Sequence, residues 1–265
     1  MKFAYIVTIH NSEQHLVHVL QGIKNVKSET SEVFCCIDGC TDRSEEIVDS
    51  FGFNKIFTNN VRETATITNA LKTIKGFDLY LITQDDVVLK DGDTEEHIKE
   101  VYSKIPNIGV LGFRHGANIE VDALINGKHA SEEDLICNEF QPEMNVEGLK
   151  EGYVTQRQIV YKSPICLSRE IVQALGGYDE RFEPIAHDDT EYCIRAMRLG
   201  FSNYVCALNL RQPVEWGGTR RFSKTHEDNF EFHMKHFNLI RELYPKELVW
   251  LGKVKPLLDK IKIWN

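Results

Sequence analysis

The sequence has 265 residues, enough for one large domain or two small ones with a substantial buried core. Hydrophobic residues make up 42% and charged residues 27% of it, which is typical of a globular protein in water. The 31 basic and 40 acidic residues give a net charge of −9, which argues against nucleic-acid binding driven by release of phosphate counterions.

The first 112 residues alternate short apolar runs with amphipathic stretches. The apolar runs predict strands, and the helical periodicity between them predicts helices. The predicted strands are 3–9, 32–37, 54–58, 77–83 and 108–113, and the predicted helices are 12–24, 42–51, 63–74 and 93–104. Asp42, with Glu45 three residues later, resembles a capping box at the start of the second helix. Because strands alternate with helices, we expect a mostly parallel sheet covered on both faces.

The second half of the chain is less regular. Residues 114–158 are acidic and weakly periodic, which predicts a long functional loop with a hairpin, or a mobile lid. After this segment, the pattern predicts a strand at 163–168, helices at 169–175 and 188–199, apolar stretches at 204–210 and a helix near 225–242.

The C-terminal tail, residues 246–264, combines an apolar stripe with regularly spaced lysines. The stripe predicts either an interfacial membrane anchor or a face that docks on the protein itself or on another subunit, as in a homo-oligomer. Pro256 breaks it into two short pieces. The residues expected on one helical face are Trp250, Val254, Leu257, Leu258, Ile261 and Trp264, with lysines at 246, 253 and 260.

The cysteines and the apolar runs indicate a cellular compartment. The seven cysteines contain no Cys-x-x-Cys pair and lie mostly in apolar runs, so we expect buried, reduced thiols. The first apolar run is too short for a signal peptide, and no apolar run reaches the roughly 18 residues of a membrane span. We therefore expect a cytoplasmic protein, with peripheral contact at the inner face of a membrane as an option for the tail.

Polar clusters follow three predicted strands, at residues 8–11, 38–42 and 84–86. Ligands of open parallel sheets bind outside the carboxyl ends of the strands. Helix capping accounts for Asp42, but Asp38 lies before a glycine turn and is less easily explained by local structure. The adjacent Asp85 and Asp86 repel each other unless a positive charge is near, so this stretch is either a Mg²⁺ or Mn²⁺ site or an exposed acidic turn.

A second acidic cluster, His187-Asp188-Asp189-Thr190-Glu191, opens a predicted helix. The positive end of the helix dipole favours carboxylates there, and this suffices for one of them. Three acids beside a histidine further suggest a carboxylate poised as a general base. Other histidines, including His15 and His18 on one helix face, are expected to be solvated or packed, because nothing completes a tetrahedral metal site.

Five motifs together resemble a known family. TIHN, DGCTDRSEEIV, TQDDVVL, GGYDERFEP and HDDTEYCIRAMRLGF occur in the order typical of family 2 glycosyltransferases of the GT-A fold, and the resemblance covers residues 3–240. It implies an α/β fold with a mostly parallel central sheet flanked by helices. The glycosyltransferase domain is then 1–242, with a nucleotide-sugar-binding half at 1–112, an acceptor and catalytic half at 113–242, and an amphipathic tail at 243–265.

The resemblance also implies roles for the residues that bind the donor. Thr8 and His10 would line the base and ribose pocket, Asp38 would accept the N3–H of uracil or thymine, and Arg62 would approach the base or the phosphates. Asp85 would hold Mn²⁺ or Mg²⁺ on the diphosphate, with Asp86 beside it.

On the acceptor side, Asp189 would deprotonate the acceptor hydroxyl, with Asp188 as the fallback for this role. The floor under the acceptor would be shaped by Gly177, Tyr178 and Asp179.

Several positions depart from the family pattern. Ile37 and Cys40 replace the usual Asp and Ser of the Asp-Asp-Gly-Ser motif. Thr83 stands at the first position of the metal motif, and Thr-Gln-Asp resembles the form of rhamnosyltransferase-like members. Where many members place a histidine that completes the metal site, Glu215, Trp216 and the later His226 remain open alternatives. The Gln-x-x-Arg-Trp motif of processive members is absent, which favours a single transfer.

The resemblance implies an inverting enzyme that moves a hexosyl or deoxyhexosyl group from a UDP- or dTDP-sugar to a glycan or lipid-linked acceptor, in polysaccharide or glycan synthesis. Two alternatives stay open. A sugar-1-phosphate nucleotidyltransferase would need a glycine-rich loop after the first strand, and TIHNSEQH has no glycine. A catalytically inactive nucleotide-sugar-binding protein would keep the fold without the chemistry.

Overall fold

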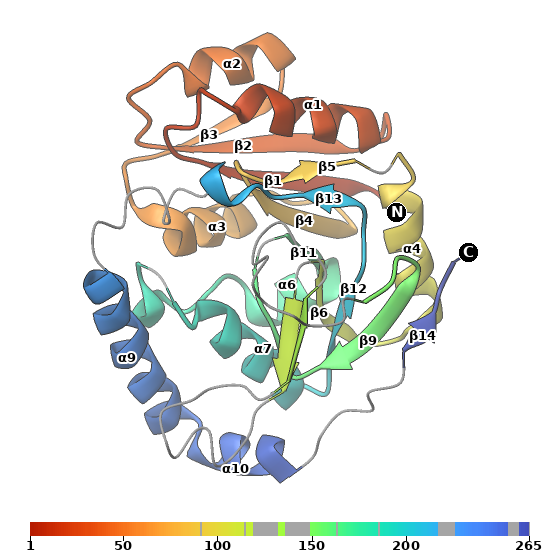
Figure 1. Cartoon of the computed structure of the whole chain (residues 1–265), viewed down its shortest axis with the longest axis vertical. Coiled ribbons are helices and arrows are strands. Elements are labelled where there is room, and N and C mark those ends of the chain that lie inside the picture. The colour runs from red at the N-terminus through yellow and green to blue at the C-terminus, as the bar shows by residue number, and fades with distance from the viewer. Residues whose placement is uncertain are drawn as a thin grey trace.

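The computed structural model describes residues 1–90, 92–113, 115–118, 132–135, 149–162, 164–184, 186–216, 226–253 and 260–264. Within these residues, nine strands form one mixed sheet in the order β14-β9-β12-β6-β11-β4-β1-β2-β3 (Figure 1). The strands are β1 (Phe3–Ile9), β2 (Glu32–Asp38), β3 (Asn54–Thr58), β4 (Leu79–Gln84), β6 (Ile108–Gly112), β9 (Tyr153–Arg157), β11 (Ile165–Ser168), β12 (Ser202–Cys206) and β14 (Ile261–Lys262).

The parallel part of this sheet comes from the first half of the chain, as predicted. Strand β1 pairs in parallel with β2 and β4, and β2 pairs in parallel with β3. All seven residues of β1 are buried, because helices cover both faces of the sheet. The second half adds β12 in parallel to β6, and β11, β9 and β14 as antiparallel strands.

Two apolar cores lie on the two faces of the sheet. Side chains of β1 alternate between them, so that Ala4 and Ile6 enter one core and Tyr5 and Val7 the other. Helices α1 (Leu16–Val26), α2 (Ser44–Phe51) and α4 (Thr94–Lys104) cover the second core, and Figure 1 shows α1 and α2 stacked on that side. The first core is covered by α3 (Arg62–Thr73), α6 (Arg169–Leu175), α7 (Asp188–Arg198), α9 (His226–Leu243) and α10 (Pro245–Lys253).

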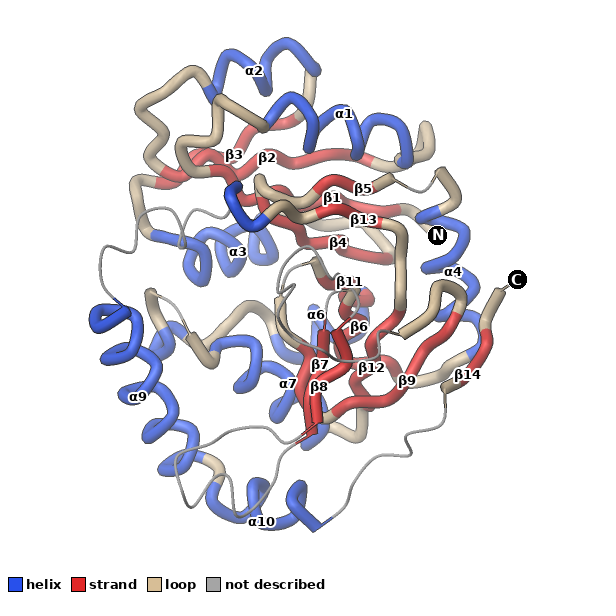
Figure 2. Tube along the Cα trace, in the orientation of Figure 1, coloured by secondary structure: helices blue, strands red, loops and turns tan. Residues whose placement is uncertain are grey.

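Two small sheets and two short helices complete the described structure. Strand β7 (His115–Asn118) pairs antiparallel with β8 (Glu132–Leu135) and with β10 (Ile159–Val160), which bears out the hairpin predicted within 114–158. Most of the predicted lid lies outside the described residues. Strand β5 (Val88–Leu89) pairs with β13 (Leu210–Arg211), and Figure 2 shows this pair alongside α1. The 3₁₀ helices are η1 (Glu180–Phe182) and η2 (Val214–Trp216).

The capping box predicted at Asp42 and Glu45 is wrong in its geometry. Arg43 occupies the N-cap position of α2, one residue later than predicted. The Asp42 carboxylate instead accepts hydrogen bonds from the backbone N–H groups of Ser44, at 3.0 Å, and of Glu13, at 2.9 Å. Glu45 pairs with Lys55. Asp42 therefore joins the turn after β1 to the start of α2.

The single helical face predicted for the tail is also wrong. Helix α10 ends at Lys253, and Ile261 lies in strand β14, which pairs with the edge of β9. An unpaired strand edge offers free backbone N–H and C=O groups, which explains why a strand forms here. The Trp264 ring stacks on that of His97, with centroids 4.0 Å apart. The end of the tail therefore docks on the protein's own body.

The described cysteines agree with the prediction of mostly buried thiols. The six cysteines in the described part of the chain are free thiols, and five of them are buried. Among the described helices, none combines the length and the apolarity needed to cross a bilayer.

Candidate active site

The carboxyl ends of β1, β2 and β4 bring three of the predicted clusters together. The parallel register places Thr8 beside Gln84, and Ile9 beside Ile37. His10, in the turn after β1, connects the other two clusters. Its backbone N–H donates to the Asp85 carboxylate at 2.9 Å, and its ring Nδ1 lies 2.6 Å from the Asp38 backbone oxygen. Since a carbonyl can only accept, Nδ1 carries a proton. The other ring nitrogen, Nε2, lies 3.4 Å from the side-chain amide nitrogen of Asn11.

The Asp38 carboxylate organises the turn between β3 and α3. One oxygen accepts from the Thr58 hydroxyl and the Val61 N–H, both at 2.8 Å, and the other accepts from the Arg62 N–H at 2.7 Å. The side chain is buried. Gly39 follows with a φ of +59°, and a Cβ there would lie 2.9 Å from the Asn60 backbone nitrogen. The tight approach of the two turns therefore requires glycine.

Arg62 begins α3 with a φ of +68°, an unusual value for a residue with a Cβ. The hydrogen bond from its N–H to Asp38 holds this conformation. Its side chain is exposed, and its approach to a nucleotide stays a prediction.

The two neighbouring carboxylates at the end of β4 have different surroundings. Asp85 is half-buried and contacts the His10 backbone. Asp86 is buried, and its carboxylate accepts from the side-chain amide of the buried Gln212 at 3.0 Å. Asp85 fits a divalent cation that keeps one or two carboxylate ligands and takes the rest from phosphates and water. Asp86 instead ties the turn to the segment after β13.

The segment after β13 contains two of the three residues, Glu215 and Trp216, that the sequence offered as alternatives for the position of a further metal ligand. Glu215 is exposed. The Trp216 ring stacks on His15 at 4.9 Å and on His18 at 5.9 Å, which fastens η2 against the start of α1. These two histidines are therefore packed, as predicted. The side chain of His226 lies outside the described residues, and within the described part no three His, Cys, Asp or Glu side chains form a metal-binding group.

The second acidic cluster lies at the start of α7. Asp188 is buried, and its carboxylate accepts from the Thr64 hydroxyl at 2.6 Å and from the Lys162 ammonium. Asp189 is half-buried. Its carboxylate accepts from the Thr190 N–H at 2.7 Å and from the Lys162 backbone N–H at 3.3 Å.

Electrostatics separates the two acids. Burial and the adjacent Asp188 carboxylate raise the pKa of Asp189 to about 6, although Lys162 opposes the shift. A carboxylate with this pKa is ionised at neutral pH and accepts a proton more readily than an ordinary aspartate. Asp189 therefore has the properties of a general base, whereas Asp188 is held in an ion pair.

The backbone before α7 is strained. Ala186 and His187 both have positive φ values, of +78° and +60°, and neither has the freedom of glycine. The ring Nδ1 of the buried His236 lies 3.1 Å from the Ala186 oxygen, and the His187 ring packs against that of His233 at 4.4 Å. Helix α9 thus holds the turn that presents Asp188 and Asp189.

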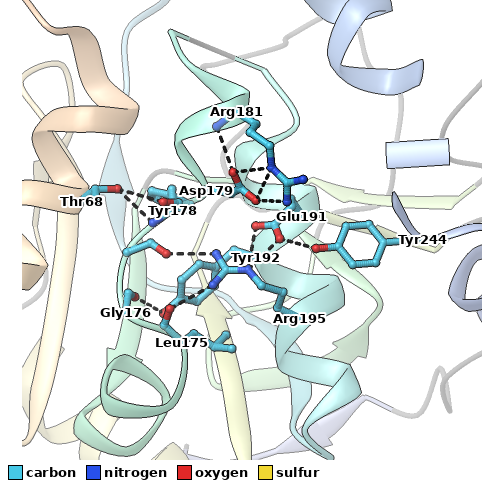
Figure 3. Close-up of polar contacts among 11 residues, drawn as sticks. Thr68, Leu175, Gly176, Tyr178, Asp179, Arg181, Glu191, Tyr192, Arg195 and Tyr244 are labelled. Atoms are coloured by element: carbon cyan, nitrogen blue, oxygen red, sulfur yellow. Dashed lines mark hydrogen bonds and ion pairs between the residues drawn. The ribbon is translucent and has the colours of Figure 1, made fainter. Parts of the chain in front are cut away.

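The predicted floor is built by the turn between α6 and η1 (Figure 3). A Cβ on Gly177 would lie 2.5 Å from the Thr68 methyl carbon, so only glycine allows α3 to pack this closely. The Thr68 hydroxyl accepts from the Tyr178 N–H at 3.0 Å. The Asp179 carboxylate accepts from the Arg181 N–H and guanidinium, and these hydrogen bonds lower the pKa of Asp179 although its partial burial opposes the shift.

The same turn is attached to α7 by one arginine (Figure 3). The Arg195 guanidinium donates to the backbone oxygens of Leu175 and Gly177, both at 3.0 Å. Its Nε donates to the buried Glu191 at 2.7 Å, and the Tyr244 hydroxyl donates to the same carboxylate at 2.6 Å. Glu191, although part of the acidic cluster, is therefore a structural residue.

Two residues of the site carry no signal in the sequence. Lys162, between β10 and β11, and Glu63, in the first turn of α3, form an ion pair 3.3 Å long. Glu63 also accepts from the side-chain amide of Gln84 at 2.7 Å. These contacts connect the turn that carries Asp85 with the start of α7. A lone lysine in a short polar stretch gives no indication that it is buried beside two aspartates.

Known glycosyltransferases are similar to this chain, one in sequence and others in structure. The chain matches no family model. Over its whole length it is 23% identical to AmsB, the amylovoran biosynthesis glycosyltransferase of Erwinia amylovora, and it covers 81% of that protein. The structure is similar to the mannosyltransferase PcManGT from Pyrobaculum calidifontis in complex with GDP-Man and Mn²⁺, with a TM-score of 0.53 and 15% identity over 78% of this chain. It is also similar to S. aureus TarS in complex with UDP-GlcNAc, with a TM-score of 0.56 and 16% identity over 90% of this chain.

These similarities confirm the predicted GT-A fold, in which a large central sheet is flanked by helices. The chain spans 55% of the mannosyltransferase and 66% of the TarS chain, so both structures contain further segments. The donors and the metal named with these structures belong to those proteins.

Proposed function

We propose that this protein is an inverting glycosyltransferase that moves a sugar from a nucleoside-diphosphate donor to an acceptor hydroxyl. One observation carries the proposal. The structure holds Asp85 at a strand end and Asp189, with its raised pKa, at a helix start, and it links their turns through Gln84, Glu63 and Lys162. The relative in amylovoran biosynthesis and the neighbours with bound nucleotide sugars support the same reaction class.

In this proposal the donor lies across the carboxyl ends of β1, β2 and β4. Thr8 and His10 line the pocket for the base and ribose. Asp38 retains an unused lone pair on the oxygen that accepts from Arg62, and this lone pair takes the N3–H of a uracil or thymine ring. The exposed Arg62 side chain reaches the phosphates.

A divalent cation fits beside Asp85. Mn²⁺ or Mg²⁺, when bound there, neutralises the diphosphate that leaves. Asp86 supports the turn through Gln212 and is not a direct ligand in this proposal.

The chain's own residues then handle the proton. The acceptor oxygen attacks C1 of the donor sugar, the bond between C1 and the phosphate oxygen breaks, and the nucleoside diphosphate leaves with the electron pair. Asp189 takes the proton of the attacking hydroxyl. Attack from the side opposite the leaving group inverts the anomeric centre, and it requires Asp189 and Asp85 to flank the sugar from two sides.

The pKa of Asp189 gives this reaction a defined pH dependence. A base must be deprotonated to act, so activity is expected to rise as the pH increases through about 6. An ordinary aspartate would be almost fully ionised above pH 5, so activity would not rise with pH near 6.

A thermal-shift screen with UDP, dTDP and GDP sugars, each with and without Mn²⁺, identifies the donor, because ligands stabilise the state that they bind. The selected donor is then followed for release of nucleoside diphosphate, with water or an added glycan as acceptor. Release that needs the wild-type Asp189 supports the proposal. Tight binding of a nucleotide sugar with no release under any condition would identify a catalytically inactive binding protein instead.

A further inference from the structure

Lys162 contacts both aspartates at the start of α7, through different groups. Its ammonium forms an ion pair with the Asp188 carboxylate, and its backbone N–H donates to the Asp189 carboxylate at 3.3 Å. The side chain is 7% exposed, and that of Asp188 is 1% exposed. A single residue thus gives the two neighbouring acids different environments, because only Asp188 pairs directly with its ammonium.

The Lys162 ammonium is enclosed on further sides. Glu63 of α3 lies 3.3 Å away, and the Tyr178 ring of the floor turn lies with its centroid 5.2 Å from Nζ. Burial would lower the pKa of Lys162, but the carboxylates of Asp188, Glu63 and Asp189 outweigh it and raise the pKa above its ordinary value. The lysine therefore remains charged throughout the working range of an enzyme.

Among the residues that the structure describes, the charges at this site do not balance. Three carboxylates, those of Glu63, Asp188 and Asp189, share one ammonium. Like charges in one site push protons onto the most weakly stabilised group. Because Asp188 receives the ion pair and the Thr64 hydroxyl, Asp189 is the acid whose proton affinity is raised.

We propose that Lys162 is a positioning residue of the transfer reaction, which neutralises Asp188 and so leaves Asp189 as the one proton acceptor at neutral pH. The proposal rests on the assignment of Asp189 as the base. Glu63 connects the lysine to Gln84, and through it to the turn of Asp85, so that the same network anchors both sides of the donor sugar.

The charged and titratable groups around Asp189 come from five parts of the chain. They are Asp188, Cys193 and His187 at α7, Lys162 before β11, Glu63 of α3, Tyr178 of the floor turn, and His233 of α9, which packs on His187. Lys162 is the cation of this set that contacts the two acids directly.

Replacement of Lys162 by methionine keeps the backbone N–H and removes the charge. Without the ammonium, we expect the pH midpoint of transfer to move upward by about one unit or more. The loss of activity should then be large at pH 6 and should shrink toward pH 8.5. Lys162→Arg keeps the charge and should keep the wild-type midpoint, whereas Glu63→Gln removes a carboxylate and should move it downward.

The matched control is Lys72→Met, which breaks the exposed pair with Glu180 and should leave the profile unchanged. A purely structural role for Lys162 predicts a different result, with activity lowered equally at every pH. An unchanged midpoint in Lys162→Met would overturn the proposal.

A second measurement does not depend on any donor. In protein labelled with ¹³C at the aspartate carboxyl carbons, the Asp189 signal, assigned from its loss in Asp189→Asn, should titrate near pH 6 in the wild type and higher in Lys162→Met. If the wild type turns over no nucleotide sugar but this shift occurs, the proposed function fails and the role of Lys162 toward the acids stands. If turnover occurs and neither midpoint moves, the proposed function stands and the proposed role of Lys162 fails.

Discussion

Replacement of Asp189 by asparagine is expected to abolish transfer and to stabilise the fold at the same time. Removal of a general base costs about 10²- to 10⁴-fold in rate. The stability gain follows from the pKa, which burial and Asp188 raise from 3.8 to about 6. A carboxyl whose pKa is raised by folding binds its proton more tightly in the folded state. Its ionisation therefore disfavours the folded state at any pH above the unfolded pKa.

The size of the effect can be worked out from the shift. About two pKa units correspond to about 3 kcal/mol at pH 8, where the group is ionised in both states. At pH 5 the folded group is mostly protonated, and the penalty is about half as large. Asparagine removes the penalty but cannot accept from the Lys162 N–H at the position of that carboxylate oxygen, which costs about 1 kcal/mol. The net expectation at pH 8 is a gain of about 2 kcal/mol.

Urea unfolding of the wild type and Asp189→Asn at pH 5 and pH 8 measures this directly. The advantage of the variant should grow by about 1–2 kcal/mol between the two pH values. Asp49→Asn, which breaks an exposed pair with Lys55, is the control and should change stability by less than about 0.5 kcal/mol at both. A variant that keeps full transfer refutes the base assignment, and a stability difference independent of pH refutes the account of the raised pKa.

Three further variants test other parts of the molecule. Asp85→Asn should remove the extra thermal stabilisation that Mn²⁺ gives in the presence of UDP, and an undiminished Mn²⁺ effect would count against the cation site. Gly177→Ala should lower stability by about 1–3 kcal/mol, because the new methyl group overlaps the Thr68 methyl group, and a neutral result in urea unfolding would contradict the packing described. Trp250→Ala should weaken co-sedimentation with anionic lipid vesicles, because Trp250 is 54% exposed and flanked by lysines on α10; equal binding by both proteins would exclude this surface.

The sequence predicted well those features that depend on neighbouring residues. Helix 169–175 has the predicted bounds, and most strands lie within two residues of theirs, because each apolar run and turn contains its own signal. Helix α1 begins at Leu16, four residues later than predicted. Residues 12–15 form a turn instead, in which the Ser12 oxygen accepts from the N–H groups of His15 and Leu16.

The features that the sequence did not predict depend on distant residues. The strand-end clusters were visible because parallel strands place their ends together, whatever their separation in the chain. The contact between Thr64 and Asp188 joins residues 124 positions apart, and nothing near either residue indicates it. The burial of Lys162 and the contact of Asp86 with Gln212 are likewise consequences of tertiary packing. The prediction of a helical tail was wrong for the same reason, because pairing with the open edge of β9 overrides helical periodicity.

The first turn of α3 explains how these separate motifs act as one site. The four consecutive residues 61–64 contact three of the motifs. The backbone N–H groups of residues 61 and 62 donate to Asp38. Glu63 contacts Gln84 and Lys162, and the Thr64 hydroxyl donates to Asp188. The left-handed conformation of Arg62 costs about 1–2 kcal/mol, and hydrogen bonds to Asp38 offset it. Strain persists only where surrounding contacts require it. The strained turn therefore keeps the proposed donor pocket and the proposed general base in a fixed relation.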